Sequence, residues 1–197
     1  MSPARRVRAL VALLLLVACD KPAATGEPAA RVVAVAPAAE NARGELCDPR
    51  PAGSAPLRLT LPALAGDAAM DVTGPAWINV WATWCPPCVE ELPLVRKLAA
   101  ELARATPSVR LALVSVDDSD DAVRAFAEKH PEVRGSLRVR DLGALDAWLP
   151  SVGLDRSATL PLHLFVDAKG ELVCTRTGAI GPDDLPRIEE LLVSGRR

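Results

Sequence analysis

Residues 77–88 read WINVWATWCPPC, an apolar run that ends in a tight Cys-x-x-Cys corner. A helical pattern follows at once, because leucine and valine recur on one face of residues 89–105. The corner therefore presents the Cys85 thiol where a strand ends and a helix begins. A helix N-terminus carries roughly +0.5 of an elementary charge and unpaired N–H groups, both of which favour a thiolate. We expect Cys85 to be an exposed nucleophile and Cys88 to be the resolving thiol.

The composition allows one packed domain and gives no electrostatic reason to expect nucleic-acid binding. Half of the 197 residues are hydrophobic and the formal net charge is -2. A Cys-x-x-Cys pair is also half of many structural zinc sites, but no second pair occurs, and His130 and His163 are isolated in the sequence. We expect no metal and no cofactor apart from a redox-active Cys85–Cys88 disulfide.

The N-terminal residues have the features of a bacterial lipoprotein signal. A basic stretch at 5–8 precedes a short apolar run at 10–17, and residues 16–19 read LVAC, which looks like a lipobox. The apolar run is too short to span a bilayer, which takes about 20 helical residues. We expect residues 1–18 to be removed and Cys19 to be lipidated. The alternative is ordinary signal cleavage just downstream, with Cys19 incidental.

The segment after Cys19 has the composition of a tether. Residues 19–46 are rich in alanine and proline and show little periodicity. A lipid on Cys19 would anchor this tether to the membrane without spanning it. We therefore expect domain 47–197 to lie in the bacterial cell envelope, outside the cytosol, where disulfides persist.

Strand and helix patterns alternate through the domain. Strand patterns occur at 57–61, 69–73, 77–81, 109–116, 137–140, 162–166 and 171–176. Helical patterns occur at 89–105, 120–129, 141–149 and 182–193, with Pro150 ending the third. Alternation followed by a terminal hairpin and helix is typical of an α/β fold with a mixed sheet and helices on both faces.

Two blocks of sequence resemble the TlpA/ResA/CcmG-type thioredoxin-like proteins, which are extracytoplasmic thiol–disulfide oxidoreductases. The first block is NVWATWCPPC at 79–88 with Glu-Leu-Pro at 91–93, and the second runs from Leu160-Pro161 through DAKGELV at 167–173. The resemblance covers roughly residues 57–192. It implies a thioredoxin-like mixed sheet flanked by helices, with a short N-terminal β extension.

The resemblance also implies a role for Glu91. Asn79 stands where thioredoxin has a buried Asp that handles the proton of the second thiol, and an amide cannot do so. Glu91 lies three residues after Cys88, so both can share a helix face. In the family the matching Glu is thought to manage this proton, and we expect Glu91 to be catalytic. The alternative is a solvated helix glutamate.

Five residues around the corner are candidates for substrate binding: Trp84, Pro86, Pro87, Leu160 and Pro161. Pro161 matches the cis-Pro of the family, whose backbone pairs with a bound partner. The alternative is an ordinary Pro at a strand start, since only about 5–6% of X–Pro bonds are cis. Pro86 and Pro87 lack N–H groups, so a Cys85 thiolate has two fewer local donors. We expect this to favour a reductant over an oxidant.

Three residues outside these motifs leave alternatives open. Leu162 and His163 stand where the family often has two Thr, and His163 either packs in a strand or joins Cys85 and Cys88 in binding copper. Cys47 and Cys174 fit no catalytic motif. They either form a structural disulfide, which is the pairing we expect, or remain free thiols, or resolve an intermediate.

The function expected from these features is disulfide reduction in exported proteins through a Cys-Pro-Pro-Cys dithiol. By resemblance, the substrates are proteins with Cys pairs, of the cytochrome c or oxidase maturation type. A membrane electron donor of the DsbD/CcdA type would then recharge Cys85 and Cys88. The alternative function is a copper-binding assembly protein that uses Cys85, Cys88 and His163.

Overall fold

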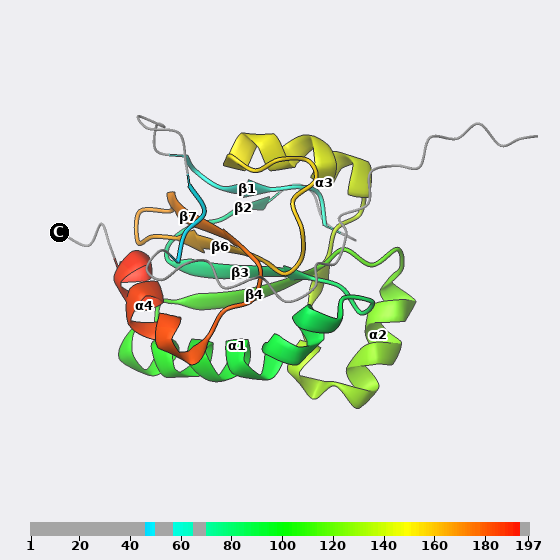
Figure 1. Ribbon diagram of the computed structural model, residues 1–197, viewed down its shortest axis with the longest axis horizontal. Helices are drawn as coiled ribbons and strands as arrows, with labels where there is room; N and C mark the ends of the chain where they lie inside the picture. Colours follow the sequence, from blue (N-terminus) through cyan, green and yellow to red (C-terminus); the bar gives the residue numbers. More distant parts are fainter. Residues whose placement is uncertain (1–45, 50–56, 65–69, 194–197) are drawn as a thin grey trace, which may run out of the picture.

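The computed structural model describes residues 46–49, 57–64 and 70–193, whose arrangement Figure 1 shows. The predicted signal segment 1–18, the lipidation site Cys19 and all of the predicted tether before Leu46 lie outside these residues. Leu46 itself is buried in the core, so it packs with the domain and not with the tether. Within the described residues, no helix combines the length and the apolar character that crossing a membrane requires.

The strand that leads into the cysteine corner is the centre of the main sheet. Strand β3, Ala76–Trp81, is buried along its whole length. It runs parallel to β4 on one side and antiparallel to β6 on the other. Because both of its faces are covered, the sequence of β3 is apolar almost throughout and does not alternate.

The main sheet has five strands in the order β5-β4-β3-β6-β7, and its mixed directions match the predicted fold class. Its other strands are β4 Arg110–Ser115, β5 Leu137–Arg138, β6 Leu162–Val166 and β7 Leu172–Thr177. A separate antiparallel pair, β1 Thr60–Leu61 and β2 Met70–Asp71, forms the short N-terminal β extension.

The helices cover both sides of this sheet (Figure 1). They are α1 Pro86–Ala105, α2 Asp120–Lys129, α3 Leu142–Trp148 and α4 Leu185–Val193. Helices α1 and α4 lie below the sheet in Figure 1, and α3 lies above it beside β1 and β2. The Trp81 and Phe126 rings are 5.9 Å apart, which places α2 against the same face of β3 as α1.

Three helices differ in their bounds from the predicted ones, and a proline lies at one end of each. Helix α1 begins at Pro86 and not at residue 89, because proline fits the first turn of a helix, where its missing N–H is not needed. Pro150 does not end helical backbone, since a 3₁₀ turn, Leu149–Val152, carries it in its own first turn. The last predicted helix likewise opens with a 3₁₀ turn, Pro182–Asp184.

The first described segment is fastened to the outer edge of β7. Cys47 is disulfide-bonded to Cys174, with Cα atoms 5.3 Å apart, as expected from the sequence. The Asp48 N–H donates to the Thr175 carbonyl at 2.6 Å, and the Thr177 N–H donates to Asp48 Oδ2 at 2.8 Å. We call residues 46–49 the N-terminal clasp.

Asp48 makes the stability of the clasp depend on pH. Burial raises the pKa of the Asp48 carboxyl above its ordinary value of 3.8, although hydrogen bonds from Thr177 and the charge of Arg176 act in the opposite direction. A raised pKa means that the folded state binds the proton more tightly, so stability falls as the pH rises through this pKa. Asp48→Asn should therefore gain stability relative to the wild type between roughly pH 3 and pH 6. Urea unfolding at several pH values measures the difference, and a constant difference would contradict the assignment.

Candidate functional site

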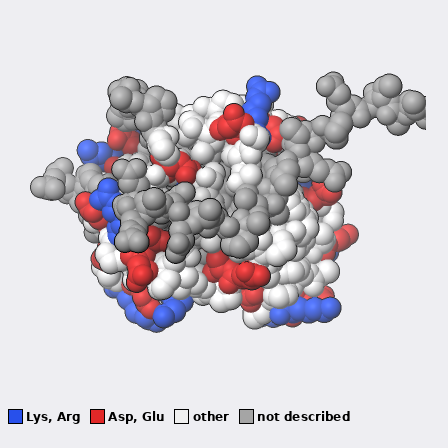
Figure 2. All heavy atoms as spheres, in the orientation of Figure 1, with Lys and Arg blue, Asp and Glu red and all other residues white. Residues whose placement is uncertain are grey.

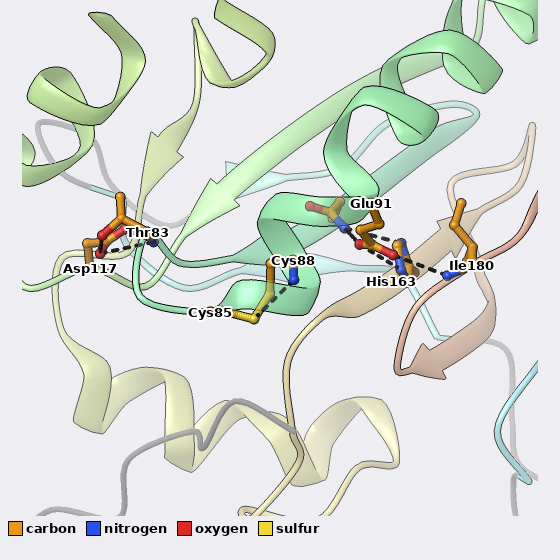
Figure 3. Close-up of a disulfide and its surroundings, with 8 residues drawn as sticks. Thr83, Cys85, Cys88, Glu91, Asp117, His163 and Ile180 are labelled. Atoms are coloured by element: carbon orange, nitrogen blue, oxygen red, sulfur yellow. Dashed lines mark hydrogen bonds and ion pairs between the residues drawn. A yellow bond between two sulfur atoms is a disulfide. The ribbon is translucent and has the colours of Figure 1, made fainter. Parts of the chain in front are cut away.

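The two cysteines of the corner lie at the start of α1, as Figure 3 shows. Cys85 is the N-cap residue and Cys88 lies in the first turn, and the two are joined in a disulfide. Pro86 and Pro87 occupy the first two helical positions and offer no N–H groups. The Cys88 N–H is the donor that remains, and it points to Cys85 Sγ at 3.3 Å. The helix start is thus built so that a single backbone donor faces the first sulfur.

Cys85 is not exposed in this oxidised state, which corrects the expectation from the sequence. Both Cys85 and Cys88 have an exposed fraction of 0%. The Cys85 sulfur is bonded to the buried Cys88. Trp84 is instead the exposed group at the corner, at 47%, and no other large hydrophobic side chain among the described residues is exposed. Pro86 is also exposed.

A cis peptide bond joins Leu160 to Pro161, immediately before β6. Val80 of β3 is paired with Leu162 of β6, so the register places Pro161 beside the end of β3 from which the cysteine corner departs. Leu160 and Pro161 are both buried. Their side chains therefore support the corner from within, while Trp84 and Pro86 form its surface.

Glu91 is a buried carboxylate one turn beyond Cys88, with 6% of its surface exposed. Asn79 Nδ2 donates to Glu91 Oε1 at 2.9 Å, and the Ile180 N–H donates to Glu91 Oε2 at 3.1 Å. Figure 3 shows the carboxylate directed toward His163 and Ile180. Glu91 is therefore not a solvated helix residue, because it is held by groups from the central strand and from the loop after β7.

His163 belongs to the same buried cluster. It is paired with Asn79 across β3 and β6, and none of its surface is exposed. Trp77 Nε1 donates to His163 Nδ1 at 3.1 Å, while His163 Nε2 lies 3.3 Å from Glu91 Oε1. Among the described residues, no group of three or more His, Cys, Asp or Glu side chains is gathered as a metal ion would require. The geometry thus ties His163 to Glu91.

A second buried carboxylate, which the sequence did not single out, holds the turn before the corner. Asp117 is 2% exposed and follows β4. It accepts from the Thr83 N–H at 3.1 Å, the Thr83 hydroxyl at 2.6 Å and the Ser115 hydroxyl at 2.7 Å. These bonds fasten the end of β3 to the end of β4, and so fix the turn that presents Trp84 and Cys85.

Asp117→Asn should lower the free energy of unfolding by about 2 kcal/mol, because an amide NH₂ would face donors and leave a buried group unpaired. Chemical denaturation of the oxidised protein measures this loss. Asp118→Asn is the matched control, since Asp118 is exposed and its change should stay within about 0.5 kcal/mol. Equal stability of the two variants would show that Asp117 does not fasten the turn.

Charges of both signs are mixed on the face of the domain that Figure 2 shows. Figure 2 shows Lys and Arg in separate groups with Asp and Glu between them on the visible face. The net charge of -2 agrees with this mixed distribution.

Comparison with known proteins matches this geometry to a family. The Redoxin family model matches residues 72–192. A thiol:disulfide interchange protein DsbE of Pseudomonas fluorescens is 34% identical over 124 residues, which are 61% of this chain and 63% of that protein. A thiol-disulfide oxidoreductase ResA of Halalkalibacterium halodurans is 25% identical over 116 residues, 59% of this chain and 61% of that protein. The chain thus spans less than two thirds of either relative.

A solved structure supports the fold separately. The crystal structure of a thiol:disulfide interchange protein of the thioredoxin family from Chlorobium tepidum superposes with a TM-score of 0.51 at 17% identity, over 71% of this chain and 97% of that one. This similarity confirms the thioredoxin-like fold, and the relatives named DsbE and ResA confirm the resemblance inferred from the cysteine corner. The match over residues 72–192 shows that the chain belongs to the Redoxin family.

Proposed function

We propose that the protein is an extracytoplasmic thiol–disulfide oxidoreductase that reduces disulfides of exported proteins. The observation that carries this proposal is the Cys85–Cys88 disulfide at the N-terminus of α1, with the Cys88 N–H directed at the first sulfur. The cis-Pro161 backbone beside the corner and the family of the chain support it. Exposed Trp84 and Pro86 provide an apolar surface for the partner around the buried sulfurs.

The reaction proceeds through one mixed disulfide. In the reduced protein, the Cys85 thiolate attacks a partner disulfide, forms a bond to one partner sulfur and releases the other as a thiolate. The Cys88 thiolate then attacks Cys85 Sγ, which closes the Cys85–Cys88 disulfide and releases the second partner sulfur. The partner gains two electrons and, with two protons, becomes a dithiol. The disulfide observed in the structure is the product of this cycle.

Glu91 supplies the proton acceptor for the second step in this proposal. Cys88 must lose its proton before it attacks, and it is fully buried, so water does not reach it in this state. Glu91 lies one turn further along α1 and is buried as well. A carboxylate held by hydrogen bonds from Asn79 and Ile180 is positioned to act as the general base.

The expected partners follow from the resemblance described above. They are exported proteins with Cys pairs, such as apocytochrome c or the copper-site proteins of respiratory oxidases. A membrane donor of the DsbD/CcdA type would return the protein to its dithiol form. A lipid on Cys19 would keep the domain near both at the membrane surface of the cell envelope.

The reduction potential of the Cys85–Cys88 pair tests the proposed direction. Equilibration of the full chain with glutathione buffers of known ratio, followed by thiol alkylation, measures this potential. We expect a value closer to about −270 mV, typical of a reducing dithiol, than to about −120 mV, typical of a strong oxidant. A value at the oxidising end would overturn the reductase assignment. Failure of the reduced protein to transfer electrons to any peptide disulfide would overturn the exchange activity itself.

A further inference from the structure

The tautomer of His163 follows from its neighbour Trp77. The Trp77 indole nitrogen is only a donor, and it points at His163 Nδ1 from 3.1 Å. His163 Nδ1 therefore acts as an acceptor and carries no proton. The proton of the neutral ring lies on Nε2, which faces Glu91 Oε1 at 3.3 Å. His163 thus presents a donor to the Glu91 carboxylate.

The two oxygens of Glu91 differ in how many donors face them. Oε1 lies 2.9 Å from Asn79 Nδ2 and 3.3 Å from His163 Nε2. Oε2 receives the Ile180 N–H at 3.1 Å. A carboxylate oxygen offers about two lone-pair positions. Two donors therefore lie near Oε1, of which Asn79 forms a hydrogen bond and His163 only approaches, and Oε2 retains an open lone-pair position.

We propose that His163 is a positioning residue for the thiol–disulfide reaction. His163 holds Glu91 Oε1, so that Oε2 receives the proton of Cys88. This inference rests on the proposed function. When the Cys88 thiol is deprotonated, its proton passes to Oε2, and Oε1 keeps its donors from His163 and Asn79. The Cys88 thiolate then attacks Cys85 Sγ and releases the partner.

The contact between His163 and Glu91 is loose in the oxidised state. Its 3.3 Å separation exceeds the roughly 2.7–2.9 Å of a charge-assisted hydrogen bond, and the Nε2–H is poorly aligned with Oε1. No better-aligned acceptor for this N–H exists among the described residues. Catalytic hydrogen bonds are often long in the resting state and shorten when the reaction proceeds. A fully buried donor kept beside the general base fits that behaviour.

Other charges near His163 come from different elements. Arg176 of β7 is its register partner, and Asp48 of the N-terminal clasp interacts with it electrostatically. The variants that test the proposal therefore leave Asp48, Arg176 and the Cys47–Cys174 disulfide unchanged.

The test separates the two chemical steps. Reduced full-length protein is mixed rapidly with a fluorescent peptide disulfide, and formation and release of the mixed disulfide are followed in time. His163→Leu removes the donor, and His163→Thr replaces the imidazole donor with the shorter hydroxyl side chain that is common at this position in the resembling family. We expect either variant to slow release at least about 10-fold while formation changes less than about 2-fold. His163→Gln retains an acceptor for Trp77 and a donor for Glu91, and release should stay within about 3-fold of the wild type.

A double-mutant cycle shows whether His163 acts through Glu91. In a Glu91→Gln background, His163→Leu or His163→Thr should slow release by less than a further factor of about 2. Any of three results would overturn the proposal. These are equal slowing of formation and release, the full slowing of release by His163→Leu in the Glu91→Gln background, and release by His163→Gln as slow as release by His163→Leu. A wild-type protein that forms no mixed disulfide would overturn the proposed function as well. If the wild type carries out both steps and the His163 variants carry them out at the same rates, only the role of His163 is overturned.

Discussion

Cys88→Ser is expected to accumulate a mixed disulfide between Cys85 and its partner that does not resolve. Among the residues that the structure describes, Cys88 is the only thiol placed to attack the Cys85 sulfur, to which it is bonded. Well-oriented intramolecular reactions have effective molarities of the order of 10⁵ M or more, which millimolar external thiols do not replace. We therefore expect release of the partner to slow at least about 10³-fold. Non-reducing gels and mass spectrometry of the reaction with a peptide disulfide measure the adduct.

Cys85→Ser is the matched control for this experiment. It retains Cys88, which is fully buried at the first turn of α1. No partner sulfur should reach Cys88, and no adduct should form. An adduct on Cys88 in this variant would show that the roles of nucleophile and resolving thiol are reversed. The adduct formed by Cys88→Ser in the cell envelope would also identify the natural partner.

Removal of the Cys47–Cys174 disulfide should cause the largest loss of stability. The two cysteines are separated by 127 residues along the chain, so their bond strongly restricts the unfolded state. The loop-closure entropy of such a loop corresponds to about 5 kcal/mol, and observed losses are typically about 2–5 kcal/mol. We expect the Cys47→Ala/Cys174→Ala double variant to lose an amount in this range, measured by urea unfolding of the oxidised protein.

The active-site disulfide provides the comparison for this loss. Cys85 and Cys88 are three residues apart, so their disulfide closes only a short loop. The Cys85→Ala/Cys88→Ala variant should therefore lose less stability than the Cys47→Ala/Cys174→Ala variant. The clasp variant should still exchange disulfides, because the cysteine corner lies on other elements. Equal losses for the two double variants would contradict the assignment of a structural role to Cys47 and Cys174.

Much of the fold follows from local sequence patterns. The strand at 162–166 and the helix at 120–129 have the predicted bounds, since their hydrophobic periodicity and flanking turn residues are local signals. The cysteine corner is equally local, because four consecutive residues supply the cap and the first helical turn. The order of strands and helices identified the fold class for the same reason.

The contacts of the site depend on pairings that local patterns do not contain. Glu91 and His163 are 72 residues apart in sequence and meet only through the register of β3 with β6, which places Asn79 opposite His163. Asp117 reads as part of a polar loop, and its role appears only when β4 lies parallel to β3. The burial of Cys85 is likewise a property of the folded corner that the local sequence pattern does not contain.

The N-terminal clasp also determines how mechanical force enters the domain. A pull on the chain before Leu46 reaches the sheet at Cys174, because a covalent bond joins Cys47 to β7. The hydrogen bonds between Asp48 and β7 are arranged in parallel with that bond and carry little of the load while it is intact. Tension from a membrane attachment would thus enter the domain through the edge strand.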